Sequence, residues 1–241
     1  MNQLLDLAVE AHGGLERWRA IERLEVSLSC SGFSFLRMKG YPEGLPNITA
    51  RIKMRRPVVS IRPYTRVDGC GHFTPDRVWI DDDKGHVLNQ RIEPRTSFAG
   101  HALETPWDQL QLLYFVSYGL WNYFNTPFFV IQPGFEVREI EPHEEHGEIW
   151  RRLHVRFPGE VPTHCREQIF FFNQEGLLQR VDYAPDVVTA SPASHHCFDH
   201  ETFSGLVFPT LRRVVQRTSA GPALSGPTAI LLQIADEAVV A

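Results

Sequence analysis

An uncharged stretch in the middle of the chain constrains the fold more than any other feature. Residues 109–135 contain no Asp, Glu, Lys or Arg, although charged residues make up 22% of the 241-residue sequence. Nine aromatic residues lie between Trp107 and Phe129. A segment of this kind has no face suited to solvent, so we expect most of it to be buried.

The same stretch carries the signals of a helix. Thr105 is predicted to be the N-cap, Pro106 fits the first helical position, and Asp108 lies in the first turn. Pro127 ends the pattern, because proline breaks a continuing helix. Such a helix of about 19 residues is roughly 28 Å long, close to the length of a membrane span.

Polar residues recurring through the segment argue against a membrane span, and no flanking basic cluster supports one. These polar residues are Gln109, Gln111, Ser117, Asn122 and Asn125. We therefore expect no transmembrane segment.

Two interpretations of this helix stay open. It is either a core helix packed on most sides, or part of its surface lines a cavity, because ligand pockets are mostly apolar with a few placed polar groups. In the second interpretation the candidate ligand-binding residues supply aromatic surface and polar tips. They are Trp107, Tyr114, Tyr118, Trp121, Asn122, Tyr123 and Phe128.

The remaining sequence predicts one α+β domain over residues 1–241, with a large antiparallel sheet. Apolar residues recur at helical spacing between residues 4 and 18, and we expect Gly13 and Gly14 to interrupt that helix. Alternating apolar and polar residues then predict strands. Residues 169–172 are apolar on both faces and are expected to be covered on both sides. The predicted strands are 24–31, 48–54, 77–80, 86–89, 152–157, 166–172, 177–183, 206–217 and 229–234.

Charge and cysteine content exclude several classes of protein. With 24 basic and 29 acidic residues the net charge is −5, so we expect no nucleic-acid partner that relies on phosphate neutralisation. Cys30, Cys70, Cys165 and Cys197 are scattered and are expected to be free thiols.

No secretory signal is visible at the N-terminus, which favours a cytoplasmic location. The oligomeric state is left open.

The densest polar cluster lies at residues 194–200, which include three histidines and one aspartate. His196, Asp199 and His200 are candidate acid–base residues, because a carboxylate can orient an imidazole. The alternative interpretation is a partly solvated loop.

No motif predicts a cofactor or a metal ion. His143-Glu144-Glu145-His146 has the wrong spacing for a zinc motif and is expected to lie in a solvated acidic rim. Gly69-Cys70-Gly71-His72 lacks the third glycine of a dinucleotide-binding loop.

Four short segments, in chain order, resemble the lipoprotein-carrier (LolA-like) superfamily. They are Ala11-His12-Gly13-Gly14, the hairpin Phe171-Phe172-Asn173-Gln174-Glu175-Gly176-Leu177-Leu178-Gln179-Arg180, the strand entry Gly205-Leu206-Val207-Phe208-Pro209-Thr210, and the closing strand at residues 230–234. The resemblance implies a half-barrel, in which a strongly curved antiparallel sheet is closed by helices over an apolar cavity. The N-terminal and aromatic helices would then pack on its concave face.

Three functions are compatible with these patterns. The first is binding of an apolar small molecule or lipid in a cavity between the curved sheet and the aromatic helix, the ligand class that the resemblance implies. The second is an enzyme that uses His196, Asp199 and His200 at the cavity mouth. The third is a protein with a filled core that acts through self-association.

Overall fold

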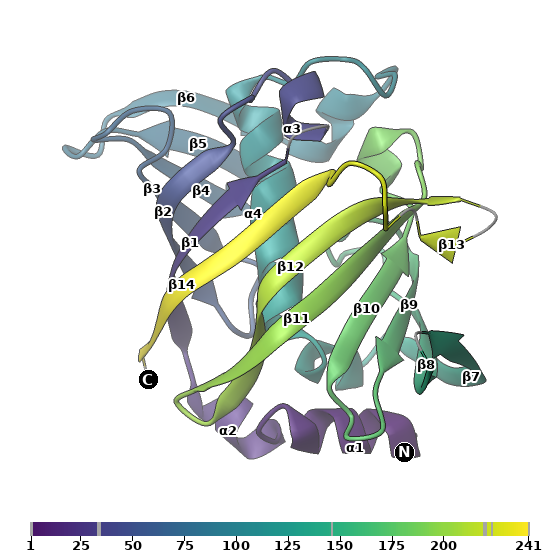
Figure 1. Cartoon of the computed structure of the whole chain (residues 1–241). Helices are drawn as coiled ribbons and strands as arrows, with labels where there is room; N and C mark the ends of the chain where they lie inside the picture. The colour runs from purple at the N-terminus through teal and green to yellow at the C-terminus, as the bar shows by residue number, and fades with distance from the viewer. Residues whose placement is uncertain (1, 33–34, 146, 219–220, 223, 241) are drawn as a thin grey trace.

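The computed structural model describes residues 2–32, 35–145, 147–218, 221–222 and 224–240 (Figure 1). The first half of the chain forms β1 (Arg23–Ser31), β2 (Leu45–Lys53), β3 (Val59–Arg62), β4 (Cys70–Thr74), β5 (Arg77–Asp81) and β6 (Val87–Ile92). The second half forms β7 (Glu136–Glu145), β8 (Glu148–Arg156), β9 (Glu167–Phe172), β10 (Leu178–Tyr183), β11 (Ala193–Phe203), β12 (Leu206–Thr218), β13 (Gly221–Pro222) and β14 (Ile230–Val240).

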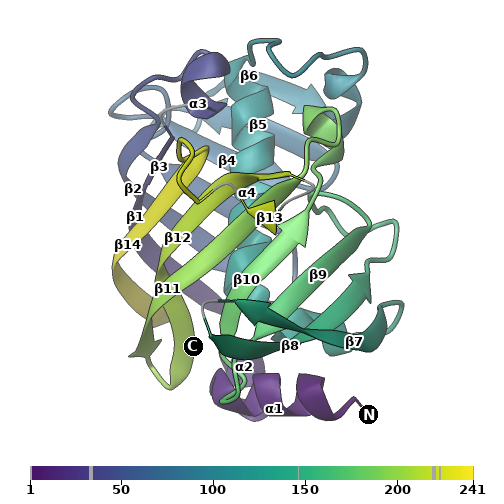
Figure 2. The ribbon, with the colours of Figure 1, turned by 45° about the vertical axis from the view of Figure 1, so that its right-hand side comes forward.

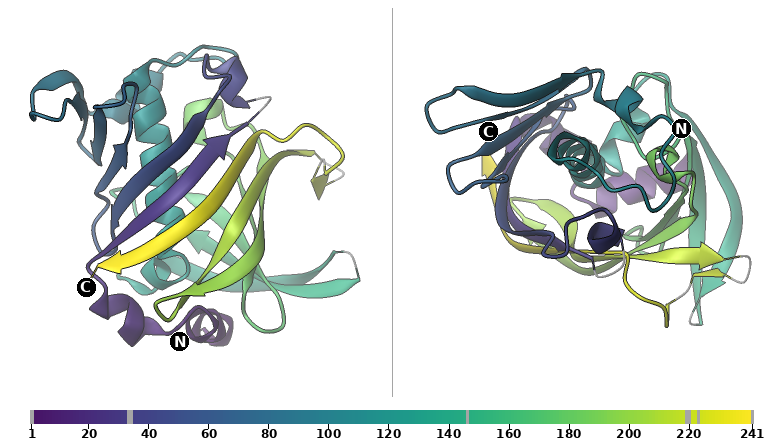
Figure 3. Two further views of the ribbon diagram at one scale, coloured as in Figure 1. Left: turned by 60° about the vertical axis from the view of Figure 1, so that its left-hand side comes forward. Right: turned by 90° about the horizontal axis from the view of Figure 1, so that it is seen from above.

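These strands form one antiparallel sheet in the order β6-β5-β4-β3-β2-β1-β14-β12-β11-β10-β9-β8-β7, with β13 added beside β12. The pairing of β1 with β14 joins two meanders into a continuous surface. Seen along its axis, the sheet curves around one helix (Figure 3). The predicted α+β half-barrel is therefore confirmed.

The helices lie inside the curve and at its ends. They are α1 (Gln3–Ala11), α2 (Leu15–Ala20), α3 (Phe35–Met38) and α4 (Gln109–Asn125), with 3-10 turns η1 (Pro94–Phe98), η2 (Phe128–Ile131) and η3 (Asp186–Val188). α4 is the helix that the sheet surrounds, whereas α1 and α2 cross the lower end of the half-barrel (Figure 2).

The aromatic helix α4 begins three residues later than its sequence predicts. Asp108, and not Thr105, is the N-cap: its carboxylate accepts from the Gln111 amide, and the Gln111 side chain accepts from the Asp108 amide. This capping box satisfies two amides that a helix start at Pro106 would leave to weaker partners. The end at Asn125, before Pro127, is as predicted.

Burial of α4 is nearly complete, since 15 of its 17 residues are buried. No helix in the described ranges combines the length and the apolar composition needed to cross a membrane. The uncharged stretch is thus enclosed by the protein's own sheet.

The two glycines between α1 and α2 interrupt the N-terminal helix, as predicted. Gly13 has a φ of +107°, and a Cβ placed on it would lie 2.1 Å from the Gly205 carbonyl oxygen. The neighbouring His12 carbonyl accepts a hydrogen bond from the Val207 amide. The break therefore lets the chain dock against the β11–β12 turn.

Each predicted strand corresponds to a strand of the sheet, but β3, β4, β7, β11 and β13 were not predicted. β3 and β4 are short, and β7 is a charged edge strand, a composition that protects sheet edges from pairing with other chains. The acidic-rim prediction for residues 143–146 is wrong for Glu145, whose side chain is only 10% exposed and pairs with Arg180. His146 lies outside the described residues.

A buried charge cluster fixes the packing around β10. Arg180 donates to both carboxylate oxygens of Asp182 at 2.7 and 2.6 Å, and Ser194 donates to the same carboxylate at 2.7 Å. The Arg180 guanidinium also lies over the Phe171 ring, 4.4 Å from its centroid. Phe171 is thereby covered on one face of β9 while Phe170 and Phe172 join the core, as the apolar pattern predicted.

Removal of one member of this pair should destabilise the fold. Asp182→Asn removes the carboxylate that binds Arg180 through two nitrogens and leaves the buried charge only partly compensated, by Glu145. It is expected to lower the free energy of unfolding by about 3 kcal/mol. The matched control is Asp186→Asn, which breaks the exposed pair with Arg95 and should cost less than about 1 kcal/mol. Urea denaturation measures both values, and equal losses would contradict this account.

Stability should also fall on acidification, because His12 is buried as the neutral base. Burial lowers the pKa of His12 to about 4 from its ordinary 6.5. The unfolded chain binds a proton between these values and the folded chain does not, so stability is intact above pH 6.5 and declines as the pH falls toward 4. At pH 5 the loss from this one histidine is about 2 kcal/mol.

Thermal denaturation at pH 7 and pH 5 tests this assignment. His12→Gln should reduce the pH-dependent change in stability, whereas His86→Gln, at an exposed position, should leave it intact. Full retention of the wild-type pH dependence in His12→Gln would show that another group is responsible.

Candidate functional site

An apolar pocket of about 270 Å³ opens at the end of the half-barrel where α3 and the start of β14 lie. Its walls come from six parts of the chain that are distant in sequence. The lining residues are Phe35, Met38, Leu103, Phe115, Tyr183, Pro185, Val188, Ser191, Pro192, Ala193, Val214, Val215, Gln216, Gly226, Pro227, Ala229 and Ile230. We call this space the mouth pocket.

None of the residues lining the mouth pocket is charged. Ser191, Gln216 and Tyr183 are the members with polar side chains, and the rest offer aliphatic, aromatic or proline surface. An uncharged wall gives an ionic group no compensation for lost hydration. The pocket chemistry therefore suits a neutral, apolar molecule or the apolar portion of a larger one.

The top of the pocket is held in place by a buried lysine. Lys39 follows α3, and its ammonium donates to the carbonyls of Leu103 and Thr105 at 2.5 and 3.1 Å. The ammonium also lies 4.9 Å from the centroid of a Trp107 ring, a cation–π contact. These contacts tie α3 to the segment before α4, and both contribute residues to the pocket wall.

None of the seven ligand-binding candidates predicted on the aromatic helix lines this pocket. From α4, only Phe115 is among its lining residues. Trp107 packs against Phe98 and Phe115 at ring-centroid distances of 5.3 and 5.0 Å. Tyr114 contacts Phe98 as well, at 5.9 Å. These rings pack against one another inside the core.

The lower candidates on the helix are also engaged by protein groups. The Trp121 indole donates to the Lys53 carbonyl at 3.0 Å, and Phe128 stacks on Trp18 with ring centroids 5.7 Å apart. Asn122 donates to the carbonyls of Tyr118 and Pro162. A role for these residues in ligand binding stays a prediction.

A buried histidine organises the remaining two candidates. His164 contacts the Tyr118 hydroxyl through Nδ1 at 3.1 Å and the Tyr123 hydroxyl through Nε2 at 2.9 Å. Its ring stacks on Tyr183 at 4.2 Å. Burial lowers the pKa of His164 to about 3, so the imidazole is neutral and both its nitrogens are occupied.

Tyr183 forms the boundary between this network and the mouth pocket. It lines the pocket and also a small space of about 10 Å³ next to Asn122 and Tyr123. The Tyr183 ring that lines the mouth pocket thus also stacks on the buried His164.

The structure does not bring the three acid–base candidates together. Phe198 and His196 stack at 6.2 Å, and the His196 Nδ1 lies 4.0 Å from Glu145. Asp199 is exposed and has a φ of +53°, and its carbonyl accepts a hydrogen bond from the Thr210 hydroxyl. His200 then contacts the Leu178 carbonyl at 2.8 Å. No hydrogen bond or ion pair joins any two of the three candidates in the described ranges.

The sequence predicted none of the residues that line the mouth pocket, and many of them lie in turns or at strand ends. The signal that could have found them is the apolar content of turn-like segments, namely Phe35, Pro185, Val188, Pro192 and Pro227. Loops are normally solvated, so apolar loop residues indicate a surface that the fold covers or uses.

Comparisons with known proteins place this geometry among established folds. No protein-family model and no curated protein matches the sequence. A DUF1329 family protein from Desulfovibrio piger has a TM-score of 0.53 at 11% identity, over 98% of this chain and 91% of that chain. A putative outer membrane lipoprotein-sorting protein domain from Vibrio parahaemolyticus has a TM-score of 0.52 at 8% identity, over 98% and 91% of the two chains.

A LolA superfamily protein from Nitrosomonas europaea is similar to this chain with a TM-score of 0.50 at 9% identity, over 94% of this chain and 92% of that chain. At these identities the likeness concerns the fold. The resemblance to the LolA-like superfamily that the four short segments indicate is thus confirmed, and the chain has the LolA-like fold.

Proposed function

We propose that this protein binds one apolar chain, such as a fatty-acyl chain, in the mouth pocket. The observation that carries the proposal is a pocket wall with no charged residue, built from six separate segments. Apolar surface buried on binding contributes roughly 25 cal/mol per Å². A wall of this composition therefore favours an alkyl chain over a polar metabolite.

Pocket size supports a ligand with a single chain. About 270 Å³ is at the lower limit of ligand pockets, which span roughly 300–1,000 Å³. One alkyl chain fits such a space, whereas a lipid with several chains would leave most of its surface outside. A polar end group would remain near Ser191 and Gln216 or in solvent.

Structural neighbours are consistent with this ligand class. One neighbour is described as a putative outer membrane lipoprotein-sorting protein domain and another as a LolA superfamily protein. Lipoproteins carry acyl chains, so a shared fold that exposes an apolar cavity suits the same chemistry. Fold likeness alone does not assign function, and the proposal therefore rests on the pocket.

Filling the pocket should abolish binding without unfolding the protein. Ala193 lines the pocket from the first residue of β11, and Ala193→Trp would place an indole in the space that an acyl chain would occupy. We expect the affinity for a dansyl-labelled fatty acid to fall about tenfold or more, equivalent to at least about 1.4 kcal/mol. Fluorescence titration measures the change.

The matched control is Ile149→Trp, which adds the same side chain at an exposed position on β8. It should bind the probe with wild-type affinity and one-to-one stoichiometry. The proposal is overturned if the wild-type protein does not bind the probe, or if Ala193→Trp binds it as tightly as the control. Native mass spectrometry of the purified protein identifies any ligand that is retained from the cell.

A further inference from the structure

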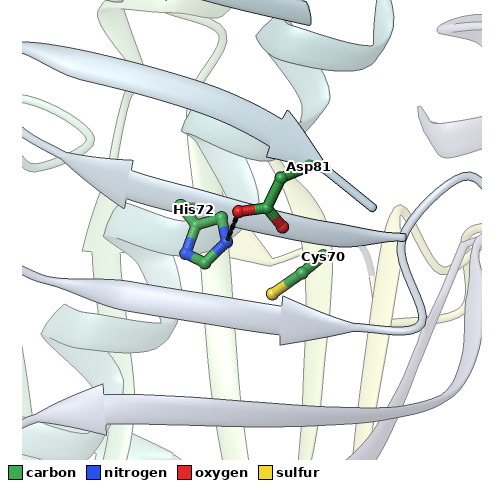
Figure 4. Close-up of side chains that lie close together, drawn as sticks. All are labelled: Cys70, His72 and Asp81. Carbon is green, nitrogen blue, oxygen red and sulfur yellow. Dashed lines mark ion pairs between the residues drawn. The ribbon is translucent and has the colours of Figure 1, made fainter. Parts of the chain in front are cut away.

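We propose that Cys70, His72 and Asp81 form a binding site for one divalent transition-metal ion of the zinc class, on the side of the sheet that faces away from α4. One donor atom from each residue lies within 4.8 Å of the other two, and Figure 4 shows the three side chains converging from β4 and β5. The site is separate from the mouth pocket, because none of its three residues lines that pocket.

The strand register explains why these three residues meet. Cys70 and His72 are two residues apart on β4, and alternation places them on one face of the sheet. Asp81 is the residue directly opposite Cys70 on β5. Gly71, between the first two, faces α4, since a Cβ placed on it would lie 2.6 Å from a Leu113 methyl group.

One donor atom of the cluster lacks a partner within the described part of the chain. His72 Nε2 lies 2.9 Å from Asp81 Oδ2, whereas the second carboxylate oxygen, Asp81 Oδ1, is buried and makes no hydrogen bond. Buried polar atoms in native proteins normally have partners. A bound cation would supply the missing partner for this oxygen.

The chemistry of the three donors selects the class of metal. Thiolate, imidazole and carboxylate are the donors that zinc takes in proteins, and a tetrahedral ion places them about 3.5 Å apart at ordinary bond lengths. Mg²⁺ and Ca²⁺ prefer oxygen donors only. Three protein donors leave a fourth position for water or an external ligand.

The surroundings allow an ion to enter and hold the imidazole in place. The side chains of His72 and Asp81 are 24% and 15% exposed, so the site is reachable from solvent. The His72 ring stacks on the Trp79 ring with nearly parallel planes and a centroid distance of 4.7 Å. The Arg77 guanidinium also lies over a Trp79 ring, 4.6 Å from its centroid. Stacking of this kind orients a metal ligand before the ion arrives.

Arg62 is the feature of the site that opposes a cation. It lies on neighbouring β3 and interacts with the Cys70 thiol, so its positive charge competes with the ion for that sulfur. This competition predicts how the metal affinity changes when Arg62 is replaced. Because glutamine removes the competing charge, Arg62→Gln should bind metal more tightly than the wild type, whereas a cluster built only for a thiol–guanidinium pair would gain nothing from that change.

Cobalt titration of the chelator-treated full-length protein tests the site directly. We expect one Co²⁺ per chain, with a thiolate-to-cobalt charge-transfer band in the near ultraviolet that Zn²⁺ competes away. Loss of one donor should weaken cobalt binding by about tenfold or more, as second-sphere changes alone cause roughly 10–100-fold losses. His72→Gln and Asp81→Asn are the decisive variants, because both side chains are partly exposed and suited to substitution.

Each decisive variant has a matched control in the same hairpin. Asp82→Asn and His86→Gln alter an exposed Asp–His pair that belongs to no cluster of three donors in the described residues. Both should bind cobalt like the wild type, as should Cys165→Ser. Absence of the charge-transfer band in the wild type overturns the proposal. Equal cobalt affinity in His72→Gln, Asp81→Asn and their controls also overturns it.

Discussion

The structure depends on one constraint, the enclosure of an uncharged helix. α4 carries no charged side chain on any face, so a flat sheet covering one side of it would leave apolar surface in water. The sheet instead curves around it, and the pairing of β1 with β14 makes two separate meanders long enough to do so. The half-barrel is thus the shape that a helix of this composition requires.

Enclosure also explains why the interior contains so many polar contacts. Asn122, Asn125 and Tyr118 sit on a helix without access to solvent, and each must find a protein partner. Asn125 accepts from the Trp18 indole, and Tyr118 contacts His164. These contacts, together with the large rings of α4, pack the interior around the lower part of the helix.

Space remains at the mouth of the half-barrel because the residues that line it there include several with small side chains. Opposite Phe115 the lining residues include Ala193, Gly226 and Ala229, whose side chains are too small to reach the helix. Aromatic density along α4 is therefore a sign of close packing, and small residues at the start of β11 and before β14 mark the pocket. Close-packed interiors leave voids only where the side chains cannot interdigitate.

The sequence by itself determined what depends on local periodicity and on charge. It predicted the break at Gly13-Gly14, the end of α4 before Pro127 and most strands, and its four short segments indicated the half-barrel. Two of these segments meet in space, because Gly13 packs on Gly205. A third packs beside them on α1, where a Cβ on Gly176 would lie 2.9 Å from Leu7. Such close contacts require glycine, and the glycines are visible in the sequence.

Only the tertiary structure decided which distant residues share a site. Cys70 and Asp81 face each other through strand register, whereas His196 lies near Glu145 and His200 contacts the Leu178 carbonyl. The mouth pocket draws its wall from six segments that no local pattern connects. Periodicity reports which face of an element is buried, whereas register, bulges and side-chain size fix what that face meets.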